Sequence, residues 1–344
     1  MTRSARSISA RRSTSASVRY LAISLRPSHV GFATHGAAAD HAANAMGFLV
    51  AHILFVVGFA LALRRAQTRG YDFFLMTGTN YATGLVIGVV WLAVAGTATV
   101  DAPTVLLGIV QGARFSLAVV AIYLLLVRTG VGITFVLLRM SVIVPTVASI
   151  VWFGERPDPP TVVGIALLLA ALPLLTRSGR SEDAQLRVWW YWPVVIGTLS
   201  VTGAGLIAAK AFVEVAPMEN LPLYATSTFA AATAIALATY IMRRRIQPEA
   251  RLVVDQPASL GFGRAFFREP LALGVVTGGV NMGQLVLILL ALRDVPGTIV
   301  FPAQSAGSAL LTIAAGYLLW HERHSRGTLA GAGLAAVGLV LVSV

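Results

Sequence analysis

Two arginines stand inside long apolar stretches of the sequence, where an ionisable side chain is costly and therefore suggests function. Arg114 and Arg139 flank a predicted turn near residue 128. At a helical rise of about 1.5 Å per residue they lie roughly 20 Å and 14 Å from the same membrane face. No Asp or Glu occurs at a matching depth in any apolar stretch. We therefore predict that these guanidinium groups bind an anionic carboxylate or phosphate group of a substrate. The structural alternative is that they bond backbone carbonyls or side-chain amides.

Several amide side chains lie at comparable depth and extend this candidate site. Gln111 stands one turn before Arg114 and shares its helix face. Asn281 and Gln284 have the same spacing and, after a shift of 167 residues, occupy the place of Arg114. Interhelical hydrogen bonding without substrate explains such amides equally well. The candidate substrate-binding residues are Arg114, Arg139, Gln111, Asn80, Asn281, Gln284 and Gln304.

The other polar residues near the predicted helices favour structural roles. Lys210 and Glu214 are four residues apart, so they can pair on one helix face, with a gating role as the alternative. Glu155 and Glu322 stand at predicted helix ends, where we expect them to stabilise the junctions. His52 is the one histidine inside a predicted span, and we expect it to have a packing role. Because no acid lies at mid-membrane depth, we favour facilitated diffusion or exchange over tight proton coupling.

The composition is that of a membrane protein. The 344 residues are 57% hydrophobic and 12% charged, with a mean hydropathy of +0.79, whereas soluble domains have about 45–50% apolar and about 25% charged residues. The net charge of +12 comes from arginines spread over short loops, which is not a nucleic-acid-binding face. The chain has no cysteine, which excludes disulfides and thiolate chemistry. The sequence offers no clustered metal ligands, paired catalytic acids or nucleophile–base pair, so we expect neither an enzyme nor a cofactor.

Ten apolar segments are each close to the length of about 20 residues that a membrane-spanning helix needs. They predict an all-α membrane protein with helices at about 46–63, 73–95, 103–127, 130–153, 159–176, 189–212, 222–242, 270–292, 296–320 and 327–344. Residues 1–45 differ, because they are rich in Ser, Ala and Arg and have no acid before Asp40. We expect a disordered cytoplasmic tail or a translation start at Met46, with an organelle-targeting segment as a third option.

The arginines also indicate an orientation in the membrane. Alternate loops, beginning with the loop after the first span, carry fifteen arginines, whereas the opposite loops carry only Arg156 and Arg293. Since positive residues favour the cytoplasmic side, the first set of loops is predicted to be cytoplasmic and both termini to lie outside. The six arginines of the N-terminal tail argue the other way, a conflict that a start at Met46 would remove.

A weak internal repeat divides the chain. A shift of 167 residues lays Glu155-Arg156 on Glu322-Arg323, Thr161 on Thr328 and Gly164 on Gly331. Each half then holds five spans, and because five is odd the second half must enter the bilayer inverted relative to the first. We predict two inverted five-helix repeats, 46–177 and 178–344, with a cavity near the midplane between them. The last span has a small-residue face that favours close packing, formed by Gly327, Gly331, Gly333 and Gly338.

Particular residues in this repeat carry a resemblance to a known family. In the first half they are Arg139, Pro145 and Gly154-Glu155 running to Gly164; in the second they are Trp320-His321-Glu322 and the Gly-rich last span. With them, residues 46–344 resemble the drug/metabolite transporter superfamily, specifically its ten-span members with two EamA-type domains. Thr312 departs from the pattern, because it stands at the place of Pro145. The resemblance implies that the first four helices of each half line the path and that the fifth helices are peripheral.

The resemblance and the residues together lead to one main hypothesis. We predict a secondary transporter, an exporter or exchanger of small metabolites, that alternates access around a midplane cavity. The alternatives are a flippase of a lipid-linked phosphate or sugar and a broad-specificity drug exporter. The expected location is the cell inner (plasma) membrane, as a multi-pass protein that is a monomer or homodimer. The expected partners are a small-molecule substrate and the lipid bilayer, not nucleic acid.

Overall fold

The computed structural model describes residues 35–69, 71, 73–96, 100–118, 138, 140–175, 192–246, 264–320 and 325–343. These residues form helices and their connections, with no strand among them, which confirms the all-α prediction for the described part of the chain. Six of the described helices are long and apolar enough to cross a membrane, and three shorter apolar helices accompany them. Residues 1–34 of the predicted tail lie outside the described residues.

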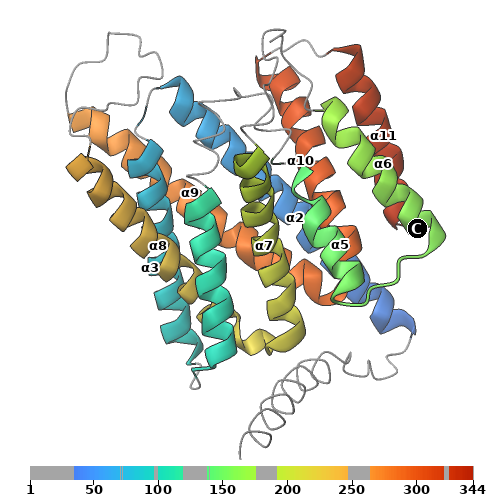
Figure 1. The fold of residues 1–344 in the computed structure, drawn as a ribbon, viewed down its shortest axis with the longest axis horizontal. Helices are drawn as coiled ribbons and strands as arrows, with labels where there is room; N and C mark the ends of the chain where they lie inside the picture. Colours follow the sequence, from blue (N-terminus) through green and yellow to red (C-terminus); the bar gives the residue numbers. More distant parts are fainter. Residues whose placement is uncertain are drawn as a thin grey trace, which may run out of the picture.

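A described helix overlaps each of the ten predicted spans (Figure 1). In the first half these are α2 (His35–Thr68), α3 (Phe73–Ala95), the helix Ala102–Ala118, α5 (Ile143–Val151) and α6 (Pro159–Leu175). In the second half they are α7 (Trp192–Val215), α8 (Leu221–Ile246) after the short η2 (Met218–Asn220), α9 (Arg264–Asp294), α10 (Gly297–Trp320) and α11 (Arg326–Ser343). The helix α2 begins at His35 and its apolar span at Ala43, ahead of the predicted boundary at residue 46.

Three helices begin with the same capping pattern, in which a threonine follows the capping residue by three positions. The capping side chain accepts the backbone N–H of that threonine at 3.2 Å in every case: Asp101 from Thr104, Asp158 from Thr161 and Ser325 from Thr328. Each bond satisfies a donor that has no partner within the helix. The caps of α6 and α11 are separated by the 167-residue shift, so equivalent sequence positions begin the last described helix of each half.

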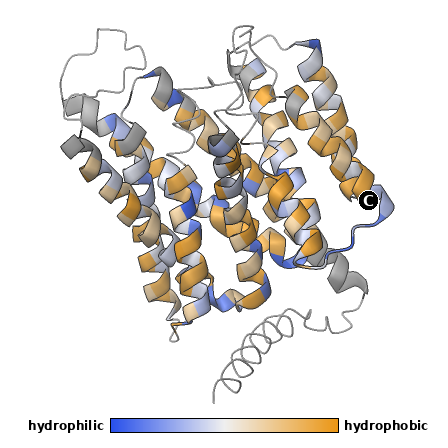
Figure 2. Cartoon of the chain, in the orientation of Figure 1, coloured by the Kyte–Doolittle hydropathy of each residue, from blue (hydrophilic) through white to orange (hydrophobic). Residues whose placement is uncertain are grey.

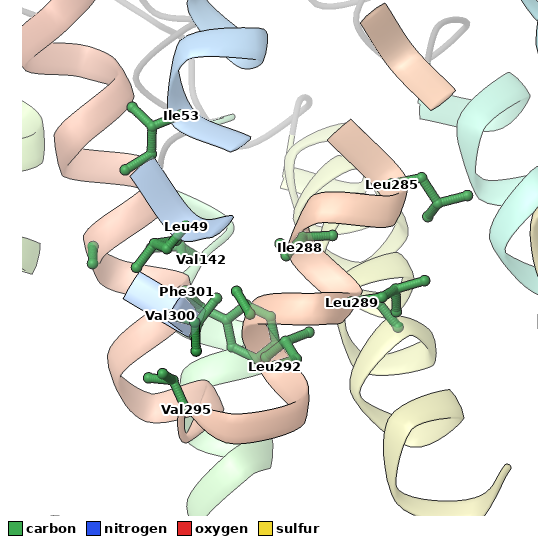
Figure 3. Close-up of a cluster of buried hydrophobic side chains, with 14 of the residues drawn as sticks. Leu49, Ile53, Val142, Leu285, Ile288, Leu289, Leu292, Val295, Val300 and Phe301 are labelled. Carbon is green, nitrogen blue, oxygen red and sulfur yellow. The ribbon is translucent and has the colours of Figure 1, made fainter. Parts of the chain in front are cut away.

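Apolar side chains fill the interior and also cover the outside. Figure 3 shows part of the interior, where Leu49 of α2, Leu289 of α9 and Phe301 of α10 belong to one buried cluster. On the outer surface large apolar residues are open, such as Val94 at 81% and Leu318 at 69% exposed. Figure 2 shows apolar residues along the helices and hydrophilic residues gathered mainly towards their ends. This distribution fits helices whose outer faces contact lipid.

The last helices of the two halves pack along each other at one edge of the bundle (Figure 1). They are antiparallel, because Gly164 near the start of α6 meets Gly338 near the end of α11. A Cβ on Gly164 would lie 2.9 Å from the carbonyl oxygen of Gly338, so only glycine allows this approach. The predicted small-residue face of α11 is thus used at Gly338, whereas Gly333 faces open space.

Two glycine pairs with four-residue spacing form close crossings between the halves. On the helix Ala102–Ala118, Cβ atoms on Gly108 and Gly112 would lie 2.9 Å and 2.1 Å from the carbonyl oxygens of Tyr224 and Thr228 in α8. On α9, Cβ atoms on Gly274 and Gly278 would lie 3.1 Å and 2.6 Å from the carbonyl oxygens of Met76 and Asn80 in α3. In both crossings the third helix of one half packs, through glycines, on the second helix of the other. The small residues bring the backbones together in the way typical of membrane helices.

Candidate functional site

A cavity of about 250 Å³ lies where helices of the two halves meet. It is lined by Val56 of α2, Leu206 of α7, residues just before α5 and residues of α10; the last two groups are Leu138, Ser141, Val142, Gln304, Ser305 and Ser308. Among the described residues, the polar side chains of its lining are three hydroxyls and one amide, all uncharged. The volume is slightly below the range of about 300–1,000 Å³ for small-molecule pockets, so the described cavity suits a small solute.

The lining draws on corresponding elements of the two halves. The segment before α5 and the helix α10 stand at equivalent places in the predicted repeat, and Ser141 and Ser308 are separated by the 167-residue shift. The helices α2 and α7 are the first helices of their halves and supply the apolar walls through Val56 and Leu206. A hydroxyl from each half therefore faces the same space.

Of the predicted site residues that the structure describes, Gln304 is the one in the wall of this cavity. Its amide oxygen lies 2.8 Å from Nε2 of His52, and Nδ1 of His52 lies 2.8 Å from the backbone carbonyl oxygen of Gln284. The histidine is only 5% exposed. The side-chain amide of Gln284 points elsewhere and donates to the carbonyl of Phe55 at 3.4 Å. His52 was predicted to have a packing role. In addition, its ring forms hydrogen bonds that join α2 to α9 and α10.

Asn80 and Asn281 form a separate pair. Nδ2 of Asn281 donates to Oδ1 of Asn80 at 3.0 Å, which joins α9 to α3. Asn80 is 2% exposed, so this bond satisfies a polar group in the interior. Neither residue is among those that line the described cavity. This geometry is the interhelical hydrogen bonding that the sequence offered as the alternative to substrate binding.

Arg114 and Gln111 lie together, as their spacing predicts, against α7. With the amide of Gln111 oriented to suit both neighbours, its nitrogen donates to the carbonyl of Gly205 at 2.7 Å and its oxygen accepts from Arg114 at 3.3 Å. The guanidinium carbon of Arg114 lies 4.6 Å from the ring centroid of Phe115, a cation–π contact. Nε of Arg114 is buried and has no hydrogen-bond partner among the described residues. Arg114 is not among the residues that line the described cavity.

Glycine at position 205 makes room for this arginine. A Cβ there would overlap Nε of Arg114 and lie 2.6 Å from the guanidinium carbon of the same residue. Any larger residue at 205 would therefore displace the arginine.

Arg139, the second predicted arginine, lies outside the described residues. Its chain neighbour Leu138 lines the cavity.

A charged cluster joins the two halves at the ends of their helices. Lys210 of α7 pairs with Glu155 at 3.0 Å and with Glu214 at 2.8 Å. The pairing of Lys210 with Glu214 is the contact predicted from their spacing. Glu155 also accepts the backbone N–H groups of Gly297 and Thr298, each at 2.8 Å, at the start of α10. Glu155 therefore has the contacts expected of a residue that stabilises a helix junction.

Sequence reasoning did not single out the serines of the cavity. Serine is common in apolar helices, where its hydroxyl usually bonds the preceding turn of its own helix; Ser141 does so with Leu138 at 2.6 Å. One signal was present, because the 167-residue shift lays Ser141 on Ser308 within the predicted repeat interface. His52 carried a second signal, as a histidine in the middle of an apolar span.

Comparison with known proteins supports a transport role. Residues 29–175 match the family model described as "Sugar transport protein", which covers less than half of the chain. No relative among the curated proteins matches the sequence. A solved structure described as "Crystal structure of protein" superposes with a TM-score of 0.65 at 16% identity, over 88% of this chain and 98% of that one, which shows a shared fold alone. Together with the apolar helices, the family match indicates a multi-pass membrane protein and supports a membrane transporter of small molecules.

Proposed function

We propose that the chain is a ten-span secondary transporter whose two inverted halves move a small, uncharged, polyhydroxylated solute, such as a simple sugar, through the cavity between them. The observation that carries this proposal is the cavity itself, which lies between the halves. Its polar lining groups among the described residues are the neutral side chains of Ser141, Gln304, Ser305 and Ser308. Hydroxyl and amide groups bind sugar hydroxyls as both donors and acceptors. The match of residues 29–175 to a sugar transport family agrees with this substrate class.

The helix contacts support two inverted halves. Corresponding helices that touch each other run antiparallel: α6 with α11, and α3 with α8, where Gly84 meets Phe229 and Gly88 meets Thr226. The two glycine crossings are also related by exchanging the halves: the third helix of the first half packs on α8, and α9 packs on α3. Inverted repeats with a site at their interface are a common basis for alternating access. The ten-span EamA-type architecture suggested by the sequence remains part of this proposal.

A second candidate substrate class is a small anion. It is favoured by the buried Arg114, whose Nε has no partner among the described residues, and by the position of Arg139 next to Leu138 in the chain. A guanidinium group binds carboxylate or phosphate in a bidentate manner. We prefer the neutral solute because Arg114 contacts Gln111, Gly205 and Phe115 and does not line the described cavity.

Ligand-dependent thermal stability of the purified chain, followed by uptake into proteoliposomes, separates these classes. The panel holds neutral sugars and polyols, sugar phosphates, carboxylates and cationic metabolites. A neutral ligand at a hundred times its Kd should stabilise the wild type by about 2.7 kcal/mol, and this gain should be lost in Gln304→Leu and reduced in Ser308→Ala. Gly58→Ala is the matched control on α2, because its Cβ would meet no atom within 4 Å.

Two results would contradict the neutral-solute proposal. Stabilisation by anions alone, lost in Arg114→Met and kept in Gln304→Leu, would assign the site to the arginine. If the proteoliposomes move only a lipid-linked substrate from one leaflet to the other, and no water-soluble solute, the protein would instead be a flippase.

A further inference from the structure

His52 lies within the apolar helix α2 and contacts the cavity wall through Gln304. It is near the centre of the apolar span Ala43–Leu63 and only 5% exposed. Both of its ring nitrogens have partners at 2.8 Å, the backbone carbonyl of Gln284 and the side chain of Gln304. An ionisable side chain at this depth suggests function. The lining of the proposed transport site includes Gln304 but not His52.

Within the part of the chain that the structure describes, the surroundings of the imidazole are neutral. The helix α10 carries no acidic, basic or histidine residue between Gly297 and Trp320, and α9 carries none between Glu269 and Arg293. On α2 itself the nearest such residues in sequence are His41 and Arg64. The charged residues of α7, Lys210 and Glu214, pair with each other instead. Among the described residues, the ring therefore interacts with Gln284 and Gln304 and with no charged group.

The hydrogen-bond chemistry of this arrangement fixes one proton and leaves the other open. A backbone carbonyl only accepts, so Nδ1 of His52 carries a proton and donates to Gln284. Nε2 then either bears a second proton or presents a lone pair. It faces the side-chain amide of Gln304, which can pair with either state because it has both an acceptor and a donor. The amide of Gln304 has an acceptor oxygen and a donor nitrogen, which exchange places when the amide turns over.

We propose that His52 is a positioning residue for the transported solute, because its protonation decides which atom of the Gln304 amide faces the cavity. When the imidazole is neutral, the amide nitrogen of Gln304 donates to Nε2 and the amide oxygen faces the solute. When a proton from cavity water binds Nε2, the ring donates to the amide oxygen and the NH₂ group faces the solute. The hydrogen-bond polarity of one wall of the site thus reverses with a single proton.

This inference rests on the proposed function, since it assumes that a solute hydrogen-bonds to Gln304. It makes solute affinity depend on pH without placing any charge in the cavity. A hydroxyl of a sugar can accept or donate, so binding persists in both states and differs in strength.

The arrangement of His52 and Gln304 can be tested without any solute by ¹⁵N NMR of the full chain labelled at histidine nitrogens, with the His52 signals assigned by their loss in His52→Gln. The expected neutral form is the Nδ1–H tautomer. Replacing Gln304→Glu places a carboxylate against Nε2 and should move the titration midpoint of His52 upward by about one pH unit or more, whereas Gly58→Ala leaves it in place. A neutral Nε2–H tautomer, or a midpoint unchanged in Gln304→Glu, would overturn the proposal.

The effect on transport is tested by the affinity for a neutral sugar that stabilises the wild type, measured from pH 5 to pH 8. We expect at least about a threefold change in affinity for the wild type and for Gly58→Ala, and a flat profile for His52→Gln, which keeps an uncharged polar group at the position. Identical profiles for the wild type and His52→Gln would reject the positioning role. If no neutral sugar binds the wild type at any pH, the proposed substrate class fails, and the NMR result still decides whether His52 controls Gln304.

Discussion

At the scale of single residues, Glu155 connects three elements of the structure. Its carboxylate accepts two backbone N–H groups at the start of α10, where the helix dipole favours negative charge. The same carboxylate pairs with Lys210, whose side chain is 6% exposed, while that of Glu155 is 12% exposed. Burial by itself would raise the pKa of Glu155, but the amide of Thr298, the charge on Lys210 and the amide of Gly297 outweigh it and hold the pKa below its ordinary value.

Removing this charge should destabilise the protein strongly. In Glu155→Gln, Lys210 loses a buried partner and α10 loses an anionic cap, so we expect a loss of about 3 kcal/mol in the free energy of unfolding. Glu214→Gln is the matched control, because it removes the other partner of Lys210, which is 36% exposed; its cost should stay below about 1 kcal/mol. Reversible unfolding in detergent, followed by circular dichroism, measures both. Equal losses in the two variants would contradict the central role of Glu155.

The lowered pKa of Glu155 also predicts how stability depends on pH. A carboxyl whose folded pKa lies below its unfolded value of about 4.3 stabilises the fold fully above that value, and the gain is lost as pH falls through the folded pKa. We therefore expect the Tm of the wild type to fall more steeply than that of Glu155→Gln as pH drops below about 4.3. Thermal unfolding at pH 7 to pH 3 checks this difference, and parallel curves for the two proteins would refute it.

At the scale of elements, close crossings through glycine hold the halves together. Lipid chains are as apolar as the side chains that they surround, so helices in a membrane associate through close packing and hydrogen bonds more than through the hydrophobic effect. The crossings at Gly112 and Gly278 bring backbones into contact, each on the third helix of one half and the second helix of the other. The pair of Asn80 and Asn281 adds a hydrogen bond beside the second crossing, because the carbonyl of Asn80 is the atom that Gly278 approaches.

Adjacent glycines on α9 give a test of these crossings. A Cβ on Gly278 would lie 2.6 Å from the carbonyl oxygen of Asn80, whereas a Cβ on Gly279 would meet nothing within 4 Å. Gly278→Ala should cost about 1–3 kcal/mol by overpacking, and Gly279→Ala should be neutral or gain up to about 1 kcal/mol from helix propensity. Unfolding midpoints in detergent distinguish the two. A crossing that tolerates alanine at 278 as well as at 279 would show that α9 and α3 are not tightly apposed.

At the scale of the whole molecule, the proposed inversion sets opposite directions for equivalent helices. In Figure 1, α6 and α11 lie side by side at one edge and begin at opposite ends of the bundle. The cavity lies inside the bundle and is lined by α2, α7, α10 and the segment before α5. This is the arrangement in which two halves can rock about a central site.

The chain lacks cysteine, so single cysteines can report this topology directly. Arg156→Cys and Arg326→Cys place thiols at exposed positions just ahead of α6 and at the first residue of α11. If the halves are inverted, a membrane-impermeant maleimide should label only one of them in sealed, uniformly oriented vesicles. The distribution of arginines predicts that position 326 faces the cytoplasm. Labelling of both positions from the same side would rule out the inverted arrangement.

The sequence alone determined that the described part of the protein is all-helical with apolar, membrane-type helices, and it determined the approximate places of those helices. Long apolar runs require helices in lipid, because every backbone polar group must be satisfied within the chain. Local spacing also predicted the pair of Lys210 and Glu214 and the contact of Gln111 with Arg114. These predictions rest on neighbours within one helix, where 3.6 residues per turn fix which side chains meet.

Only the tertiary structure decided which polar residues of different helices meet. The partners Asn80 and Asn281 are 201 positions apart, and His52 and Gln304 are 252 apart. In a soluble helix the apolar face shows which side is buried, but a membrane helix is apolar both towards lipid and towards its neighbours. The rotation of each span was therefore not encoded in its hydrophobic pattern. Close packing at glycines contributes to that rotation, as at Gly205, which makes room for Arg114 against α7.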